Sequence, residues 1–259
     1  MNERRVLLGV ATAGQPAAPF LESLAHLRLP PSVAELKRSV AVGNYIPGQR
    51  ELIMNDAVDG GFDYLFFVDD DVILPPDALE KLVATAEADP LTGVVGGLYY
   101  SRDSVRPIAV ADWNSADTST AHIPAFTSTS TDIVDGIGFG CALLRVSPAV
   151  KLGAPYFPSH VYIERLAHRV RQCDEDYLYC ERVRKIGNVV RLDARVRCPH
   201  YDRISDSTAP IAWESDSVTS VPRMIVLEDD AFRLVPLDVS VPRVVEHHAR
   251  ADVTYITVD

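Results

Sequence analysis

The first two hundred residues alternate between short apolar runs and stretches in which apolar positions repeat with a helical period. An apolar run over 5–12 ends at a polar turn over 13–16, and a second run over 36–42 is followed by a helical pattern over 49–58. Short apolar runs bounded by turn residues are typical of buried strands. The alternation therefore predicts an open α/β sheet with polar loops at the carboxyl ends of its strands.

The most strongly apolar run, over 63–68, leads directly into Asp69, Asp70 and Asp71. After two prolines, apolar residues recur at i, i+3, i+4 and i+7 from residue 79, which predicts a helix to about residue 88. A further strand is predicted over 93–99. A buried central strand is thus expected to deliver three carboxylates to the carboxyl edge of the sheet.

The second half of the chain predicts a more varied structure. Residues 101–132 are rich in Ser, Thr, Asp and Ala, which predicts a long loop that either lines a substrate or is a surface loop without a role. A strand is predicted within 133–146, a helix from 174 and a strand over 189–196. The tail predicts short β segments, over 225–227, 232–235, 239–245 and 253–258. We expect a main α/β domain over 1–205 and a β-rich extension over 206–259.

The composition narrows the class of protein. Hydrophobic residues make up 47% and charged residues 24% of the 259 residues, as in an ordinary folded domain, and the net charge of -11 argues against a surface built to bind nucleic-acid phosphates. No apolar run approaches the roughly 18 residues that a membrane helix needs, and we interpret residues 6–13 as a strand and not as a signal peptide. The four cysteines show no C-x-x-C pairing, so we expect reduced, buried thiols in a cytoplasmic protein.

The cluster of Asp69, Asp70 and Asp71 indicates binding of a cation. Three adjacent buried carboxylates repel one another and destabilise a domain unless cations compensate their charge. Mg²⁺ and Mn²⁺ prefer carboxylate oxygens, and such a cation neutralises the negative charge that develops on a diphosphate leaving group. Asp69 to Asp71 therefore predict a site that holds a divalent cation against a phosphate-bearing substrate.

Residues 66–72 (FFVDDDV) and 75–77 (PPD) together resemble the D-x-D segment of GT-A glycosyltransferases, especially those similar to family 2. The resemblance covers about residues 4–202. It implies a Rossmann-like mixed sheet flanked by helices that binds a nucleotide-diphospho-sugar, followed here by the β-rich extension. It further implies that Asp71 binds the metal and Asp69 the metal or the nucleotide, and that Thr12, Arg50 and Asp70 lie in the nucleotide site.

The resemblance extends to Glu175 and Asp176, which look like the E-D pair of the same family. In inverting members this aspartate is the base that deprotonates the acceptor hydroxyl, and burial of Asp176 on the apolar face of its helix would raise its pKa toward the range that a base needs. Capping of the helix N-terminus is the structural alternative. His200 stands where several metal-dependent GT-A enzymes place a histidine ligand on the cation.

Asp135, Gly136 and Gly138 resemble the glycine-bearing segment that lines the acceptor side of these enzymes, where missing side chains let a sugar approach closely. A tight structural turn is the alternative. The resemblance as a whole implies a metal-dependent, inverting transfer of a hexose or pentose from a nucleotide sugar, UDP- or GDP-linked, to a hydroxyl. The acceptor stays open between a glycan, a protein, a small molecule and a modified nucleic acid, and the extension is expected to support a homo-oligomer.

Two other classes of protein compete with this interpretation. Haloacid-dehalogenase-like phosphohydrolases also begin with an apolar strand and D-x-D, and a second acidic group stands at 228–230, but here a strand–helix–strand unit precedes the motif. A sugar- or partner-binding protein that retains the fold without the chemistry is the other alternative. Phosphatase activity without a sugar nucleotide favours the former, and the absence of donor turnover favours the latter.

Overall fold

A computed structural model describes residues 3–101, 107–116, 120–158, 160–164, 169–202, 207–209, 223–228, 231–236 and 255–256. The chain divides into two compact units, residues 1–214 and 215–259. The first unit holds the largest sheet and all the helices of the described residues. The predicted boundary between a main domain over 1–205 and an extension over 206–259 stays a prediction.

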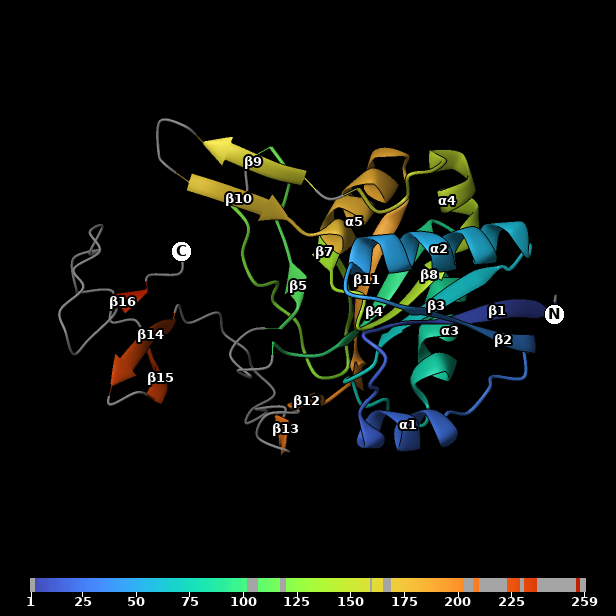
Figure 1. Cartoon of the computed structure of the whole chain (residues 1–259), viewed down its shortest axis with the longest axis horizontal. Coiled ribbons are helices and arrows are strands. Elements are labelled where there is room, and N and C mark those ends of the chain that lie inside the picture. The colour runs from blue at the N-terminus through green and yellow to red at the C-terminus, as the bar shows by residue number, and fades with distance from the viewer. Residues whose placement is uncertain are drawn as a thin grey trace. The chain divides into compact units, whose positions relative to one another are not determined.

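The first unit is built on a mixed sheet of seven strands (Figure 1). Their order across the sheet is β2-β1-β3-β8-β4-β11-β6. The parallel pairs are β1–β2, β1–β3 and β4–β11, whereas β8 is antiparallel to both its neighbours and β6 is antiparallel to β11. The strands are β1 (Arg4–Thr12), β2 (Val33–Val42), β3 (Tyr64–Asp69), β4 (Thr92–Leu98), β6 (Thr131–Val134), β8 (Cys141–Arg145) and β11 (Val189–Arg197).

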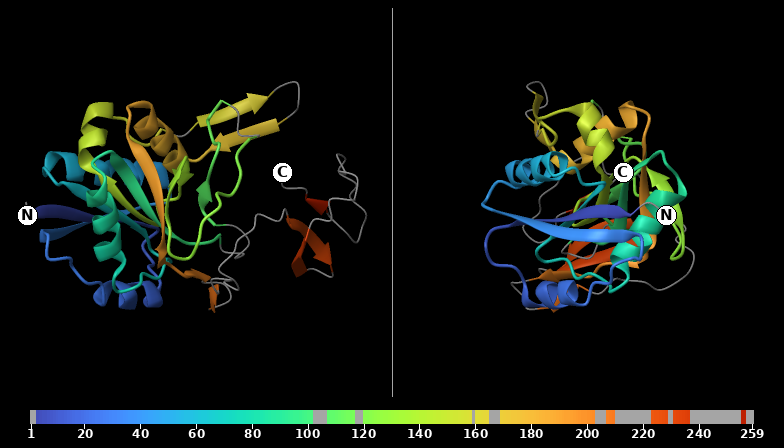
Figure 2. Two further views of the ribbon diagram at one scale, coloured as in Figure 1. Left: turned by 180° about the vertical axis from the view of Figure 1, so that it is seen from behind. Right: turned by 90° about the vertical axis from the view of Figure 1, so that its right-hand side faces the viewer.

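Helices cover both faces of this sheet (Figures 1 and 2). The helices α2 (Ile46–Asp59), α4 (Val146–Leu152) and α5 (Glu175–Lys185) pack on one face, and α1 (Ala18–Ala25) and α3 (Ala78–Ala88) pack on the other. Because successive strand residues point to opposite faces, Leu65 and Phe67 of β3 enter the first core and Phe66 the second. All three are essentially unexposed, and burial of each such side chain contributes roughly 1.5–3 kcal/mol.

Small antiparallel pairs complete the first unit. They are β5 (Ala109–Val110) with β7 (Gly136–Ile137), β9 (His160–Glu164) with β10 (Arg169–Cys173), and β12 (His200–Asp202) with β13 (Ser207–Ala209). In the second unit, β14 (Arg223–Glu228) pairs with both β15 (Ala231–Pro236) and β16 (Tyr255–Ile256). The β segment predicted over 239–245 lies outside the described residues, as does most of the one over 253–258.

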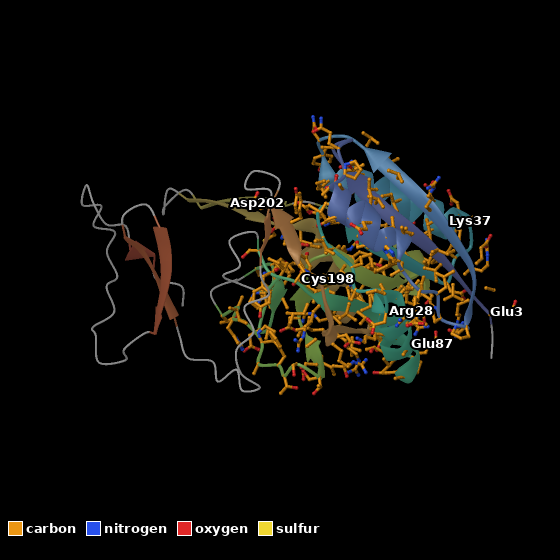
Figure 3. All side chains as sticks on the ribbon, turned by 90° about the horizontal axis from the view of Figure 1, so that it is seen from below. Glu3, Arg28, Lys37, Glu87, Cys198 and Asp202 are labelled. Carbon is orange, nitrogen blue, oxygen red and sulfur yellow. The ribbon has the colours of Figure 1, made fainter. Side chains whose placement is uncertain are left out.

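The structure confirms the predicted strands over 5–12, 36–42, 63–68 and 93–99 and the predicted helix that follows the second proline. The helices α1 and α4 and the hairpin of β9 and β10 were not predicted from the sequence. All four cysteines are free and buried, as expected, and Cys198 lies among the packed side chains drawn in Figure 3. No described helix is long and apolar enough to cross a membrane.

Candidate active site

Polar side chains gather at the carboxyl edge of the sheet, where β1 and β3 end side by side. The two strands are parallel and in register, with Ala11 opposite Asp69, so Thr12 and the aspartates meet at one edge. Thr12 donates a short hydrogen bond from its hydroxyl to the Asp70 carboxylate, and the Gly14 amide donates to the same hydroxyl at 2.9 Å. The structure therefore joins two of the residues predicted for the nucleotide site, although their contact with a nucleotide stays a prediction.

Arg50 lies at the centre of the edge and joins three elements. From α2 it donates through Nη2 to Asp69 Oδ1 at the end of β3, at 3.1 Å, and through Nη1 to Glu175 Oε1 at the start of α5, at 2.6 Å. Asp176 Oδ2 lies 3.9 Å from the same Nη1. The sequence placed Arg50 in the nucleotide site, but its partners within the chain are the carboxylates predicted for metal binding and for catalysis.

Glu175 and Asp176 form the first turn of α5, where the helix dipole stabilises negative charge. Burial raises the pKa of Asp176 to about 7, since removal from water disfavours the carboxylate, while the Arg50 guanidinium opposes the shift and Glu175 and Asp174 add to it. A carboxyl group with a pKa near 7 is divided between its acid and base forms at neutral pH. It can therefore accept a proton from a substrate and release it again.

Tyr99, the residue after β4, lies close to the Asp69 and Asp176 carboxylates. Its hydroxyl accepts a hydrogen bond of 3.0 Å from the Gly140 amide. Burial raises the pKa of Tyr99 well above its ordinary value, and the neighbouring Asp69 and Asp176 carboxylates raise it further, so the hydroxyl stays neutral. Nothing in the sequence singles out this residue, because a tyrosine next to an apolar run is typical of a core position.

Asp71 and His200 come together from distant parts of the chain. The Tyr201 amide donates to the Asp71 carbonyl at 2.8 Å and the Ile73 amide to the Pro199 carbonyl at 2.9 Å, so backbone bonds align the two segments. His200 Nε2 lies 3.2 Å from Asp71 Oδ1, and both side chains are largely buried. Two of the three predicted metal ligands are thus adjacent, while the carboxylate of the third, Asp69, is bound to Arg50.

The chemistry of this pair fits a divalent cation. His200 Nδ1 lies 2.9 Å from the Tyr100 carbonyl oxygen, and that bond requires the proton to be on Nδ1. In the neutral imidazole, Nε2 then presents a lone pair to a carboxylate oxygen, which is repulsive unless a proton or a cation lies between them. Neighbouring ligands at about 2.1 Å from one ion lie about 3 Å apart, close to the observed separation.

The protein supplies only part of a coordination shell. Across the described ranges, no three His, Cys, Asp or Glu side chains are close enough to hold a metal ion by themselves. Mg²⁺ is commonly held by one or two carboxylates together with substrate phosphates and water. Asp71 and His200 therefore fit a cation that binds together with a diphosphate, and they do not fit a fully protein-bound structural metal.

The predicted acceptor-side glycines are tightly packed. A Cβ atom at Gly138 would lie 2.1 Å from the Tyr99 hydroxyl oxygen, and one at Gly136 would lie 2.7 Å from the Tyr177 ring. The missing side chains thus make room for two tyrosines of the chain itself. This packing accounts for both glycines, and their contact with an acceptor stays a prediction.

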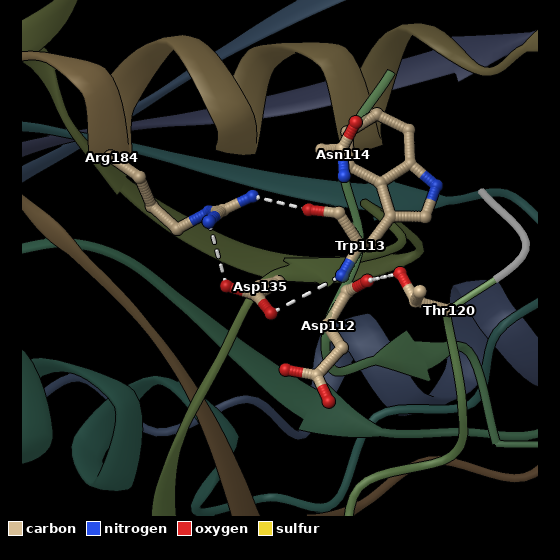
Figure 4. Close-up of a pocket in the computed structure, with 6 residues that line it drawn as sticks. All are labelled: Asp112, Trp113, Asn114, Thr120, Asp135 and Arg184. Carbon is tan, nitrogen blue, oxygen red and sulfur yellow. Dashed lines mark hydrogen bonds and ion pairs between the residues drawn. The ribbon is translucent and has the colours of Figure 1, made fainter. Parts of the chain in front are cut away.

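An open surface pocket of about 550 Å³ lies beside Asp135 (Figure 4). Arg184 Nη1 forms an ion pair with Asp135 Oδ1 at 2.7 Å, and the Trp113 amide donates to Asp135 Oδ2 at 3.3 Å, so both contacts hold the carboxylate at the pocket wall. Arg184 stands eight residues after Asp176 on α5, or about 12 Å along the helix. The lining residues are Asp112, Trp113, Asn114, Thr120, Asp135 and Arg184.

A mixed sheet of this order, with carboxylates, an arginine and a histidine where its parallel strands end, defines a GT-A fold, as the sequence predicted. Residues 56–152 match the model of glycosyl transferase family 2, which confirms the predicted resemblance to that family. The match includes β3 and the three aspartates. The matched stretch is less than half of the chain, so the comparison shows a resemblance to that family and agrees with the fold.

Solved structures share the fold at low sequence identity. The chain is similar to A197 from STIV, with a TM-score of 0.53 and 17% identity over 94% of this chain and 100% of that one. It is also similar to GalNAc-T7 crystallised with UDP, GalNAc and Mn²⁺, with a TM-score of 0.50 and 8% identity over 77% of this chain and 44% of that one. A sequence search of curated proteins gives no significant match.

Proposed function

We propose that the protein is a metal-dependent, inverting glycosyltransferase that moves a hexose or pentose from a UDP- or GDP-linked donor to an acceptor hydroxyl. The observation that carries the proposal is the pairing of Asp71 with His200, whose Nε2 faces a carboxylate while Nδ1 is bound to a carbonyl. Mn²⁺ or Mg²⁺ would be held by this pair. When bound, such a cation supplies positive charge to the departing diphosphate.

On the donor side, the chain's own groups orient the nucleotide sugar. Thr12 and Asp70 are linked at the ends of β1 and β3, where the crevice outside a parallel sheet usually takes a nucleotide. Asp69 is held by Arg50 and so keeps a fixed carboxylate at the same edge. The presence of UDP and Mn²⁺ in the GalNAc-T7 structure is consistent with this choice of ligands.

On the acceptor side, Asp176 takes the proton of the attacking hydroxyl. The hydroxyl oxygen forms a bond to the anomeric carbon as the bond from that carbon to the diphosphate oxygen breaks, and the nucleoside diphosphate leaves. A single displacement of this kind inverts the configuration at the carbon. A base with a pKa of about 7 is well matched to proton transfer at neutral pH.

The test is a panel of sugar nucleotides mixed with the protein and Mn²⁺, with release of free nucleoside diphosphate measured with and without the metal. We expect metal-dependent release from one donor, and loss of that release in Asp71→Ala. A matched control is Asp59→Ala, since Asp59 is exposed on α2. Absence of both turnover and donor binding for every nucleotide would defeat the proposal.

The competing classes are separated by the same experiment. The family match over the aspartates favours a transferase over a phosphohydrolase, and release of inorganic phosphate from a simple phosphomonoester would reverse that preference. Donor binding without turnover, across a panel of glycans, proteins, small molecules and modified nucleic acids as acceptors, would indicate a binding protein. The cytoplasmic location and the homo-oligomer stay predictions, and nothing in the comparisons supports the latter.

A further inference from the structure

We propose that Arg50 is a positioning residue that holds the acceptor-side carboxylates Glu175 and Asp176 in place against the donor-side Asp69. The inference rests on the proposed transferase function. It assigns Arg50 a role within the protein instead of the contact with the nucleotide that the sequence suggested.

The Arg50 guanidinium binds carboxylates of two different elements. Nη1 binds Glu175 at 2.6 Å and Nη2 binds Asp69 at 3.1 Å, so one planar group fixes the start of α5 relative to the end of β3. The glutamate stands 125 residues further along the chain than the arginine. A guanidinium can bridge two carboxylates in this way because its donors diverge in a rigid plane, whereas an ammonium is a single point charge.

The surroundings of Arg50 leave it little capacity for a ligand. Its side chain is 6% exposed, and its guanidinium carbon lies 5.5 Å and 5.9 Å from the ring centres of Phe139 and Phe67. Nε is buried without a partner among the described residues, so it too faces protein and not solvent. The two terminal nitrogens are occupied by carboxylates of the chain.

The charges at the site also require Arg50. One guanidinium is surrounded by the three carboxylates of Asp69, Glu175 and Asp176, two of which are buried. Removing the cation would leave these carboxylates to repel one another in a poorly solvated place. The chain responds to such repulsion by moving side chains apart or by protonating one of them, and either response displaces the base from the acceptor.

The groups that face Asp176 come from several elements. Arg50 of α2 lies on one side, and Glu175 and Asp174 precede Asp176 in the chain. Tyr99, which follows β4, and Cys180 of α5 interact with it electrostatically. Only Arg50 among these carries positive charge. A change at Arg50 is therefore expected to alter the base more than it alters the nucleotide.

The experiment compares Arg50→Gln and Arg50→Lys with the control Arg145→Gln. Arg145 is a matched control because it is also largely buried, lies over the Tyr64 ring at 5.0 Å and donates to backbone carbonyls. It pairs with the start of β3, which is about 17 Å from the end that carries Asp69. Each variant is assayed for kcat, donor KM, affinity for the nucleoside diphosphate with Mn²⁺, and amide hydrogen exchange over 174–178.

We expect Arg50→Gln to lower kcat about 100-fold, as misplacement of a catalytic group by about 1 Å does, and Arg50→Lys to lose less. Because Arg50 also holds the donor-side Asp69, donor KM and diphosphate affinity should weaken in Arg50→Gln, but by a smaller factor than kcat falls. Exchange over 174–178 should rise in Arg50→Gln and not in Arg145→Gln. A raised donor KM or weakened diphosphate binding with kcat unchanged would overturn the inference, as would unchanged exchange.

A double-mutant cycle tests the same link in a second way, which is needed if Arg50→Gln alone does not fold. Glu175→Gln removes one of the carboxylates that Arg50 compensates, so the double variant Arg50→Gln/Glu175→Gln tolerates the loss of the cation better than the single one. We expect the double variant to lose no more kcat than the worse single variant, and additive losses would contradict the link. Wild-type protein without turnover for any donor would defeat the proposed function, and the exchange data would still decide the role of Arg50.

Discussion

Replacement of Asp176 by asparagine tests the electrostatics of the proposed base. In the unfolded chain this carboxyl titrates near its ordinary pKa of 3.8, whereas burial in the folded protein raises the pKa to about 7. The folded state therefore binds the proton more tightly than the unfolded state does between these values. The free energy of unfolding should accordingly fall as the pH rises from about 4 to about 7, and it should stay low above that range.

The size of the effect follows from the shift. Each pKa unit corresponds to roughly 1.4 kcal/mol, so a shift of about three units costs about 4 kcal/mol of stability at pH 8. Asparagine carries no charge, and its side-chain oxygen can keep the 2.8 Å bond from the Tyr177 amide, but its amide would face the Arg50 donors. With that loss included, we expect Asp176→Asn to be more stable than the wild type by about 2 to 4 kcal/mol at pH 8 and by little at pH 4.

The assay is urea unfolding at pH 4, 6 and 8, with Asp59→Asn as an exposed control. Transferase activity measured on the same samples should be lost in Asp176→Asn, while wild-type kcat should decline as the pH falls below about 7 because the base becomes protonated. A variant that gains no stability between pH 4 and pH 8 would refute the buried-carboxylate reasoning. Activity retained by a stabilised variant would refute the role of Asp176 as base.

Other predictions concern His200 of the proposed cation site and the contacts of Tyr99 with Gly138 and Gly140. His200→Ala should weaken Mn²⁺ binding in the presence of a nucleoside diphosphate at least roughly tenfold by calorimetry, and the same change at the exposed His26 should not. Tyr99→Phe leaves the buried Gly140 amide without its acceptor, so urea unfolding should show a loss of about 1–3 kcal/mol, and a neutral effect would contradict the bond. Gly138→Ala places a methyl group against the Tyr99 hydroxyl and should cost about 1–3 kcal/mol in the same assay, whereas an unchanged midpoint would show that the tyrosine moves freely.

The strand before Asp69 and the helix from residue 79 could be predicted because each has a clear local pattern of apolar residues. The apolar run before Asp69 and the helical repeat from residue 79 both reflect burial against one core, and the structure places them as expected. The helix α1 could not be predicted in the same way, since it has only eight residues and is held by tertiary packing of Phe20, which is 1% exposed. Short helices of this kind depend on what they pack against.

The candidate site residues could be selected from the sequence only one by one. A family resemblance singled out Asp71, His200 and Asp176 as candidates, and their roles stay predictions, but no local pattern indicates that Arg50 reaches across from α2 to Glu175. That contact depends on the order of strands in the sheet, where β8 runs antiparallel between β3 and β4. Similarly, the glycines near Asp135 could not be distinguished from a sugar-binding segment until Tyr99 and Tyr177 were seen to fill the space.

The backbone bonds between residues 71–73 and 199–201 have a consequence for folding. The segment between Asp71 and His200 includes more than half of the first unit, so a cation held by both would cross-link its two ends without a covalent bond. Closing so long a loop costs the unfolded chain roughly 4 kcal/mol of conformational entropy. Once β11 has docked, this cost has already been met by folding, so it does not weaken binding of the cation. The cation would then be bound, and the enzyme active, only after β11 has joined the sheet. Partly folded chains would not use their donor.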